Sequence, residues 1–583
     1  MNIVSTYREI LKKEQGFIKK KRGNRLSVAL IYPNLYHIGM SSLGFQVVYG
    51  LLNKKDGVVA ERFFLPSEDE LLIYKGSKSG ISSLESQIPL NKFDLIAFSL
   101  SFENDYINVL KILELGKIPL MAEERESIYP IVLAGGVATF LNPEPLSLFI
   151  DIFVLGEAEE NLERIIDLFI ESRNRFTTKK ELLLFLARNE KTLYVPQFYQ
   201  VKYNKDGTIA SFYPQEKGLS EKIKVSKKLH LEPVACSSII SPDTEFANRI
   251  LIEVARGCGR SCRFCAAGYV YRPPRHYEMD TLISTIASIL KKSRYLGLLS
   301  ASISDVPGIN NIMDLIHKKG GLFSISSVRA DSITNELLEQ LKRTGQRQVT
   351  IAPDAGSERL RKVINKHLDE ETIIKAVSLI AEAGLSIKLY FIIGLPTEEK
   401  EDIKEILRLI KLVKHHMVRA GAPKGRVGNI RINISCFIPK PFTPFQWLPM
   451  DDIQDLKEKQ KWLYREIKKE GGIKTSFDVP KWAYVQSLLS LGDRRVSYIL
   501  LLAHRFNGNW KKAFKYSEIN PDFFVYRNRD FSEILPWDLI DHGIDKKYLE
   551  QENKKALSAI ESSICYYGVR KCKRCGICGS LSL

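Results

Sequence analysis

The sequence of 583 residues contains no long hydrophobic run. Apolar stretches such as 498–503 end well short of the roughly 18 residues that a membrane-spanning helix needs. Charged residues interrupt residues 1–15, where a secretory signal would keep an apolar core. No internal repeat or low-complexity tract is present. These absences argue against a membrane-spanning, secreted or fibrous protein, and they predict a cytoplasmic one.

The composition is that of a folded protein with several domains. Hydrophobic residues make up 44% and charged residues 26% of the chain, and at roughly 150 residues per domain the length suggests about four domains. The net charge of +18 is compatible with nucleic acid, an acidic lipid surface or an anionic substrate. Because the lysines are spread along the whole chain, charge alone selects none of these, and nucleic acid stays an open partner.

The N-terminal third alternates short apolar runs with segments of helical periodicity. Five such runs between residues 26 and 172 predict parallel βαβ units in a flavodoxin-like, doubly wound sheet. Residues 1–25 resemble a basic leader. Residues 173–245 lose the alternation and predict a small β-rich linker, with a turn at Asp206-Gly207. The fold class is therefore α/β in this part of the chain.

The alternation resumes in residues 246–448. Six apolar runs separated by helix-period segments predict a partial (β/α)6, TIM-like barrel, in which chemistry sits at the C-terminal ends of the strands. Residues 449–561 are predicted to be mostly helical, and residues 562–583 form a tail with four cysteines. The expected barrel strands are 250–255, 298–303, 322–327, 347–351, 386–393 and 430–436.

Nine cysteines are present, and most of them are clustered. In a reducing compartment, clustered thiols indicate metal ligands before disulfides. Cys258, Cys262 and Cys265 are separated by three and two residues, directly after the first barrel strand. Three thiolates on one loop can bind three irons of a [4Fe–4S] cluster and leave the fourth iron open to a substrate. The alternatives are a zinc site, a redox-inert site and three incidental thiols.

The same loop is rich in arginine and glycine. Arg256, Arg260 and Arg263 are expected to offset the negative charge of a thiolate-ligated cluster. Gly257 and Gly259 allow other backbone segments to approach closely.

This loop, with Phe264 before its last cysteine, resembles the signature of the radical S-adenosylmethionine (radical SAM) enzymes. The resemblance implies a barrel in which the open iron chelates the amino and carboxylate groups of S-adenosyl-L-methionine (SAM). One-electron reduction, from a donor such as flavodoxin or ferredoxin, then cleaves SAM into methionine and a 5′-deoxyadenosyl radical.

The resemblance also implies a set of SAM-binding residues past the third, fourth and fifth strands. A Gly-Gly-Glu segment that is common after the second strand is missing, and Ser302 and Asp305 are candidates for its role. The alternative for each polar residue is a helix cap, as Ser357 precedes a predicted helix. The implied SAM-binding residues are Arg329, Asp354, Ser357, Gly394 and Pro396.

The N-terminal sheet resembles the cobalamin-binding domain that precedes the barrel in many radical SAM enzymes. Gly135 and Gly136 after the fourth strand, and Gly156 after the fifth, suit a flat corrin or its nucleotide tail. His37 lies in the loop after the first strand, but no Asp precedes it by two residues, so it is a poor cobalt ligand. Either cobalamin binds without a histidine ligand, or the domain is a relic.

The C-terminal cysteines form a second group. Cys565, Cys572, Cys575 and Cys578 have a spacing that suits a second [4Fe–4S] cluster, although zinc and free thiols stay open. Cys236 and Cys436, which stand alone, are expected to be small buried residues.

Together these features resemble a radical SAM subgroup with an N-terminal cobalamin-binding-like domain. The implied function is a [4Fe–4S] enzyme that generates a 5′-deoxyadenosyl radical, with cobalamin-dependent methylation of an unactivated carbon as the leading reaction. The alternative reaction is RNA or protein modification, such as methylthiolation, without cobalamin. A different class of function is an iron–sulfur protein that binds nucleic acid or transfers electrons.

Overall fold

The computed structural model describes residues 3–75, 80–565 and 572–580. Its first sheet has the strand order β2-β1-β3-β4-β5-β6, in which the first five strands are parallel and β6 is antiparallel. All seven residues of β1 are buried, which explains why its sequence is a continuous apolar run rather than an alternating one. The strands are β1 (Leu26–Tyr32), β2 (Val58–Phe64), β3 (Leu95–Ser99), β4 (Ile131–Gly135), β5 (Ile152–Val154) and β6 (Leu193–Tyr194).

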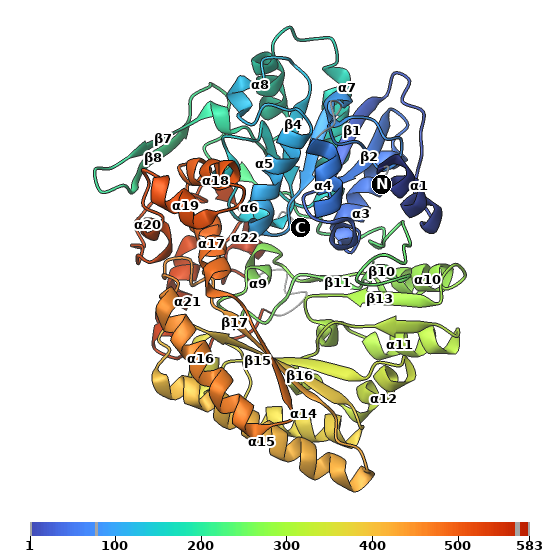
Figure 1. Ribbon diagram of the computed structural model, residues 1–583, viewed down its shortest axis with the longest axis vertical. Coiled ribbons are helices and arrows are strands. Elements are labelled where there is room, and N and C mark those ends of the chain that lie inside the picture. Colours follow the sequence, from blue (N-terminus) through green and yellow to red (C-terminus); the bar gives the residue numbers. More distant parts are fainter. Residues whose placement is uncertain (1–2, 76–79, 566–571, 581–583) are drawn as a thin grey trace.

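Helices cover this sheet. The helices α3 (Leu43–Lys54) and α7 (Ala158–Glu171) pack against each other, and α5 (Tyr106–Leu115) packs on a C-terminal helix, α18 (Val496–Arg505). Figure 1 shows the first sheet and its helices above the rest of the chain. The α/β class with parallel strands is confirmed.

The region predicted to be a β-rich linker contains a helix. Helix α8 (Lys179–Asn189) begins at a capping box, in which Thr178 and Glu181 exchange hydrogen bonds with each other's backbone. The chain then adds β6 to the first sheet. The hairpin of β7 (Tyr199–Tyr203) and β8 (Ile209–Pro214) follows, with Asp206-Gly207 between its strands.

A second set of parallel strands follows in two hydrogen-bonded sheets, β10-β13-β14 and β15-β16-β17-β18. A hydrogen bond from the Val328 amide to the Thr350 carbonyl (2.9 Å) joins them. The second predicted strand, 298–303, lies earlier in the chain, as β13. Strand β18, with alternating burial, falls in the region predicted to be mostly helical. The strands are β10 (Ile250–Glu253), β13 (Tyr295–Leu299), β14 (Leu322–Ser324), β15 (Gln348–Asp354), β16 (Ser386–Ile393), β17 (Ile430–Cys436) and β18 (Ile473–Phe477).

The helices of this second region separate its strands. They are α10 (Met279–Ile289), α11 (Ile309–Lys318), α12 (Asn335–Arg343), α13 (Glu358–Val363), α14 (Glu370–Glu382) and α15 (Lys400–Gly421).

The C-terminal region returns to the first sheet. The Asn142 side chain donates to the carbonyls of Ser490 (3.0 Å) and Gly492 (2.7 Å), and Arg494 forms an ion pair with the buried Glu144. Its elements are α16 (Ile453–Glu470), α17 (Pro480–Leu491), α18, α19 (Trp510–Tyr516), α20 (Asp522–Val525), β19 (Ile540–Asp541), α21 (Lys546–Leu557) and α22 (Ile577–Ser580).

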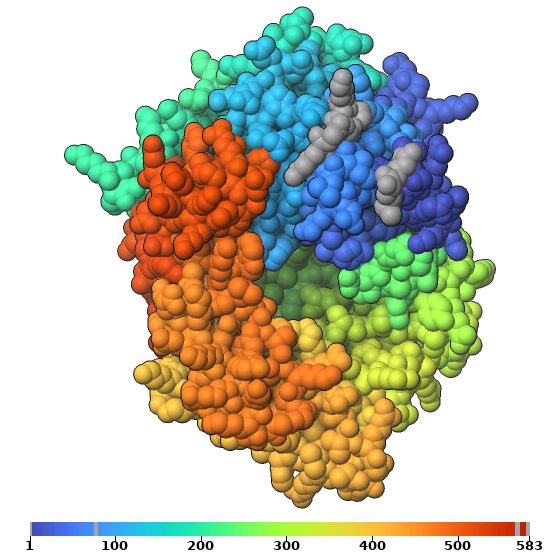
Figure 2. Space-filling model, in the orientation of Figure 1, coloured from blue at the N-terminus to red at the C-terminus, as the bar shows by residue number. Residues whose placement is uncertain are grey.

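These contacts join the C-terminal region to the first sheet. Figure 2 shows a hollow where the N-terminal, middle and C-terminal parts of the chain meet. Among the described residues, every helix is too short or too polar to cross a membrane.

The basic leader predicted at the N-terminus belongs to the folded core. Helix α1 (Ile3–Lys13) is followed by Glu14, whose carboxylate is fully buried and lies 2.6 Å from Arg62. Arg62 also pairs with Glu85 at 2.6 Å, and neither side chain is exposed. Three buried charges thus join the leader to β2.

We expect Glu14→Ala to lower the free energy of unfolding by about 3–5 kcal/mol, because Arg62 would keep only one of its two buried partners. Urea unfolding measures this change. Glu9→Ala on the exposed face of α1 is the matched control and should leave the unfolding midpoint unchanged. Equal midpoints for the two variants would contradict the account.

Candidate functional site

The first cysteine group lies on a loop that a short β-ladder closes. Strand β11 (Ala255–Arg256) pairs antiparallel with β12 (Arg275–His276), so Arg256 and Arg275 stand opposite each other at the base of the loop. Between them lie the three cysteines and helix α9 (Ala267–Val270). Gly257 has a positive φ, and a Cβ there would lie 2.5 Å from the Tyr271 carbonyl, so the tight turn requires glycine.

The three thiols of the loop influence one another. Burial, with a smaller contribution from Cys262, raises the pKa of Cys265 to about 11. Burial also raises the pKa of Cys258. Thiols in this state are protonated at neutral pH, and a metal cation is what stabilises the thiolate form. Within the described ranges, no three His, Cys, Asp or Glu side chains are placed around a single ion. Three cysteine thiolates are a donor set of the kind that binds iron–sulfur clusters.

The three arginines of the loop form ion pairs with carboxylates. Arg256 pairs with Glu157, Glu159 and Glu253. Arg260 pairs with Asp305 and Asp331. Their role in the structure is to hold the loop, because ion pairs that are largely buried restrict the side chains that form them.

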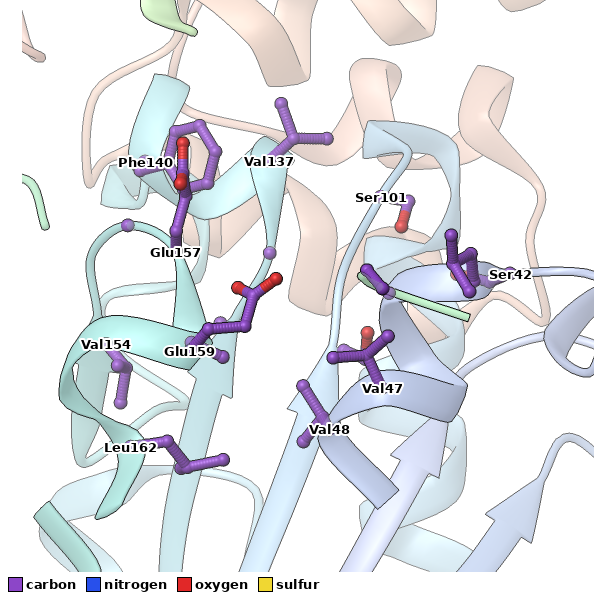
Figure 3. A pocket seen from close by; sticks show the side chains of 18 of the residues that line it. Ser42, Val47, Val48, Ser101, Val137, Phe140, Val154, Glu157, Glu159 and Leu162 are labelled. Atoms are coloured by element: carbon purple, nitrogen blue, oxygen red, sulfur yellow. The ribbon is translucent and has the colours of Figure 1, made fainter. Parts of the chain in front are cut away.

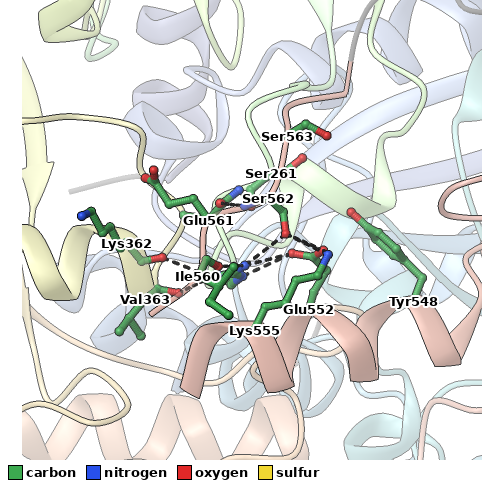
Figure 4. Close-up of polar contacts among 12 residues, drawn as sticks. Ser261, Lys362, Val363, Tyr548, Glu552, Lys555, Ile560, Glu561, Ser562 and Ser563 are labelled. Atoms are coloured by element: carbon green, nitrogen blue, oxygen red, sulfur yellow. Dashed lines mark hydrogen bonds and ion pairs between the residues drawn. The ribbon is translucent and has the colours of Figure 1, made fainter. Parts of the chain in front are cut away.

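Arg263 is fully buried and anchors the loop from behind. Its guanidinium lies 3.2 Å from Glu552 on α21 and donates to the carbonyls of Lys362, Val363 and Ile560. Figure 4 shows Lys362, Val363, Glu552, Ile560 and Ser562 gathered in this region. Charge-assisted bonds of this kind are stronger than neutral ones, so the loop is fixed to the C-terminal helix.

A further cation that interacts with the thiols, Lys366, lies outside the cysteine loop. Lys366 forms an ion pair with Asp354 at the end of β15. Burial lowers the pKa of Lys366, but the charges of Asp354 and Cys262 outweigh burial and raise it. Asp354 has a φ of 64°, next to a register shift in β15. Backbone strain at a non-glycine residue is commonly found at functional sites.

Arg329 and Asp305 lie near Cys258. The Arg329 guanidinium donates to Asp331 (3.0 Å) and to the Lys366 carbonyl (3.2 Å). Burial raises the pKa of Asp305, but hydrogen bonds from Arg260 and Ser302 outweigh it and lower the pKa. Both side chains are charged and influence the Cys258 thiol. The structure therefore brings Arg329, Asp354 and Asp305 to the cysteine loop.

The remaining predicted SAM residues have local structural roles. Ser357 caps α13 by accepting from the Leu360 amide (3.1 Å) and donates to Asp402, which matches the helix-cap alternative. The Gly394 amide donates to Glu398 (2.9 Å), and Pro396 lies two residues farther along the loop after β16.

A cavity of about 540 Å³ lies between the first sheet and the cysteine loop. It runs from the sheet face into the space beneath α3 and α7, and Gly257, Ala267 and Tyr271 of the cysteine loop line its far side. Figure 3 shows Val47 and Val48 on one wall, and Leu162 and Glu159 on the other. The sheet residues that line it include Val28, Leu30, Leu95, Ala97 and Leu133.

The predicted glycines line this cavity. A Cβ on Gly136 would lie 2.4 Å from the Leu100 carbonyl, and one on Gly156 would lie 2.4 Å from the Ser226 amide. Both have positive φ. Gly135 adds open backbone at the end of β4. His37 lies outside the lining, half-exposed and 3.8 Å from Glu245, so it is not placed to reach a ligand there.

Sequence reasoning missed the residue that joins the cavity to the cysteine loop. The buried Glu157 lines the cavity and accepts from Arg256 (2.9 Å), Arg275 (2.7 Å) and the Lys228 amide (2.9 Å). Burial raises its pKa, but the two arginines outweigh burial and lower it. The acid follows Gly156 directly, which is a local signal, but its partners lie about a hundred residues away in the sequence.

The C-terminal cysteines lie beside the first group. The Cys565 amide donates to the Gly259 carbonyl (2.6 Å). Cys575 contributes to raising the pKa of Cys565, and Cys565 contributes to raising the pKa of Cys578. The part of the tail in residues 566–571 and 581–583 lies outside the described residues. Cys436 is buried as predicted, and Cys236 is half-buried.

Comparisons with known proteins agree with these features. One family model, described as radical SAM proteins, N-terminal, matches residues 44–196, and another, described as radical SAM superfamily, matches residues 252–410. Uncharacterized protein MJ0966 of Methanocaldococcus jannaschii is 30% identical over 477 residues, which cover 81% of this chain and 90% of that protein.

Two more distant likenesses concern enzymes. A tRNA-2-methylthio-N(6)-dimethylallyladenosine synthase of Clostridium botulinum is 19% identical over 252 residues, covering 40% of this chain and 52% of that protein. The radical S-adenosylmethionine methyltransferase TsrM from Kitasatospora setae, solved with cobalamin and a [4Fe–4S] cluster, has a TM-score of 0.46 and 13% identity. That match covers 71% of this chain and 75% of TsrM.

Replacing Glu157 with Gln should destabilise the cysteine loop by about 3 kcal/mol, because Arg256 and Arg275 would lose a shared buried carboxylate. Urea unfolding at pH 7 measures this change, with Glu160→Gln on the exposed side of α7 as the control.

The pH dependence of the free energy of unfolding tests whether Glu157 stabilises the loop as a charged carboxylate. Because the folded pKa of Glu157 is lowered, its contribution exists above the ordinary glutamate pKa and is lost as the pH falls through the folded value. The difference between wild type and Glu157→Gln should therefore shrink in acid. A difference that grows in acid would refute this role.

Proposed function

Because the chain belongs to the radical SAM superfamily, whose enzymes use a [4Fe–4S] cluster and SAM, we propose that Cys258, Cys262 and Cys265 are the cluster ligands. The observation that carries this proposal is the position of the three thiols. They share one loop that β11 and β12 close, and Gly257, Ala267 and Tyr271 of the same loop line the cavity. The chain is an enzyme of this superfamily.

When bound, the reduced cluster supplies the electron that cleaves SAM into methionine and a 5′-deoxyadenosyl radical. The protein's own residues would position SAM and hold charge. Arg329 offers a guanidinium for the SAM carboxylate, and Asp305 offers a carboxylate for its amino group. Lys366 offsets the charge of the thiolate at Cys262. The closed loop excludes water from the radical, which is the protein's share of the work in a cofactor enzyme.

We further propose that the cavity holds part of a cobalamin. Its volume is in the range of small-molecule sites, and its walls between the sheet and the helices α3 and α7 are mostly apolar, which suits a flat aromatic tail. The glycine backbone at Gly135, Gly136 and Gly156 would lie against the corrin. We interpret the order of the first five strands as the flavodoxin-like one, which places a ligand at this edge of the sheet.

The chemistry of the lining decides the mode of binding. None of the described residues that line the cavity is His, Cys or Met. Cobalt there would have no imidazole or sulfur ligand from the lining. The cavity also borders the cysteine loop, so a cofactor held there would lie next to the site where the radical would form. Methylation of an unactivated carbon is therefore the reaction we propose.

A second candidate is methylthiolation of RNA or protein without cobalamin. The observation in its favour is the distant likeness to a tRNA methylthio synthase, together with the second group of cysteines. An iron–sulfur protein without catalysis is excluded if SAM is cleaved. RNA binding would show as a linear fall of log affinity with log salt.

The test of the radical SAM assignment is the formation of 5′-deoxyadenosine. Anaerobic protein with dithionite and SAM should release it, as measured by chromatography and mass spectrometry. A triple alanine variant of Cys258, Cys262 and Cys265 should lose at least 100-fold of the cleavage activity, because the cluster would lose all three of its proposed loop ligands. Cys236→Ala and Cys436→Ala are controls that should retain activity. Full cleavage by the triple variant would refute the ligand assignment.

Cobalamin binding has its own test in helix α3. Gly44 lines the cavity and a Cβ there meets nothing within 4 Å, whereas Gly50 lies in the same helix with equal space but outside the lining. Gly44→Phe should weaken cobalamin binding at least tenfold by filling the cavity, and Gly50→Phe should leave it unchanged. Equilibrium dialysis against hydroxocobalamin measures both. Equal affinities, or no binding by wild type, would overturn the cobalamin proposal.

A further inference from the structure

Arg272 is a buried cation without a carboxylate partner among the described residues. Its side chain is 1% exposed. The guanidinium donates to the carbonyl of Gly268 (2.7 Å), to the hydroxyl of Ser261 (2.7 Å) and to the hydroxyl of Tyr548 (3.2 Å), all of which are neutral. A buried charge normally has a partner of opposite charge, because leaving it alone is unfavourable by several kcal/mol.

A second basic side chain, that of Lys227, lies beside Arg272. The partly buried Lys227 donates to the carbonyls of Arg272 (3.0 Å) and His542 (2.8 Å), and none of the ion pairs within the described ranges includes it. Burial lowers the pKa of Lys227 to about 7, although the charges of Glu157 and Asp541 act to raise it. Two basic side chains therefore meet in one place, and an anion beside them would favour their charged forms.

The groups that could supply the anion are the C-terminal thiols. Cys575 is buried, and its carbonyl accepts from the Asp545 amide (3.0 Å), three residues past the His542 carbonyl to which Lys227 donates. Arg272 donates to Ser261, two residues past Gly259, and the Gly259 carbonyl accepts from the Cys565 amide (2.6 Å). Neutral thiols give no compensation, but thiolates would.

We propose that Cys565, Cys572, Cys575 and Cys578 bind a second iron–sulfur cluster, whose net negative charge is compensated by Arg272 and Lys227. The close spacing of the last three cysteines suits a cube better than a single zinc, which prefers two separate pairs. The proton of each thiol leaves on metal binding. This inference does not depend on the proposed reaction, since it concerns only charge and ligands at the tail.

The site is joined to the first cysteine loop by short contacts. The Cys565 amide donates to the Gly259 carbonyl, and a Cβ on Gly259 would lie 2.2 Å from the Cys565 carbonyl oxygen. Arg272 donates to Ser261 between Cys258 and Cys262. The Cys575 carbonyl accepts from the Asp545 amide (3.0 Å) at the start of α21. The second cluster would thus hold the tail against the first loop.

Iron content and spectroscopy of two variants test the site. The full chain is purified anaerobically as wild type, as the first-loop triple alanine variant, and as a tail triple alanine variant of Cys572, Cys575 and Cys578. Each triple variant should retain about half of the wild-type iron, and the reduced first-loop variant should show a cluster signal by electron paramagnetic resonance. No iron in the first-loop variant, or about one zinc in its place, would overturn the proposal.

The role of the two basic side chains is tested by the midpoint potential of the cluster rather than by the stability of the fold. In the first-loop variant, Lys227→Met should shift the midpoint potential of the remaining cluster to a more negative value, because a nearby positive charge favours the reduced form. Lys224→Met, at an exposed position of β9 (Ile223–Lys224), is the matched control. Equal potentials for the two variants would contradict the assignment of charge.

The outcome is separable from that of the proposed function. Wild type that contains both clusters but releases no 5′-deoxyadenosine would refute the reaction and support the second site. Wild type that cleaves SAM, with a first-loop variant free of iron, would support the reaction and refute the second site.

Discussion

The shared carboxylate of Glu157 is the interaction on which the arrangement of the site depends. It follows the last parallel strand of the first sheet, and it accepts from Arg256 and Arg275, which stand at the two ends of the cysteine loop. One buried acid therefore closes the loop and docks it on the first sheet. The energetic reason is that two arginines and one carboxylate that are buried together are stable only as a set.

Three neighbouring sites follow from that docking. Gly257 and Tyr271 of the loop line the cavity, the cysteines between them form the proposed cluster site, and Arg272 faces the C-terminal thiols. Arg263 and Glu552 fix the back of the loop to α21. A cofactor in the cavity and a cluster on the loop would be close enough to share one substrate, which is what methyl transfer to a carbon radical requires.

Much of this could be predicted from local sequence. The apolar runs gave the parallel strands, the glycines after β4 and β5 marked the cavity, and the cysteine spacing marked the loop. Helix α8 and strand β18 were not predicted, because a capping box and an alternation over five residues are weak signals beside the hydrophobic pattern of the neighbouring segments. The pairing of charges was not predictable, since Glu157 and Arg275, or Arg263 and Glu552, meet only after folding. For the same reason the carboxylate partners of the loop arginines could not be predicted.

The most direct test of the account is the cobalt and iron content of the full chain. The protein would be purified anaerobically from cells supplied with cobalamin. The account predicts about one cobalt and roughly eight irons per chain, from one cobalamin and two four-iron clusters. Roughly four irons without cobalt would contradict both the cofactor in the cavity and the second cluster at the tail.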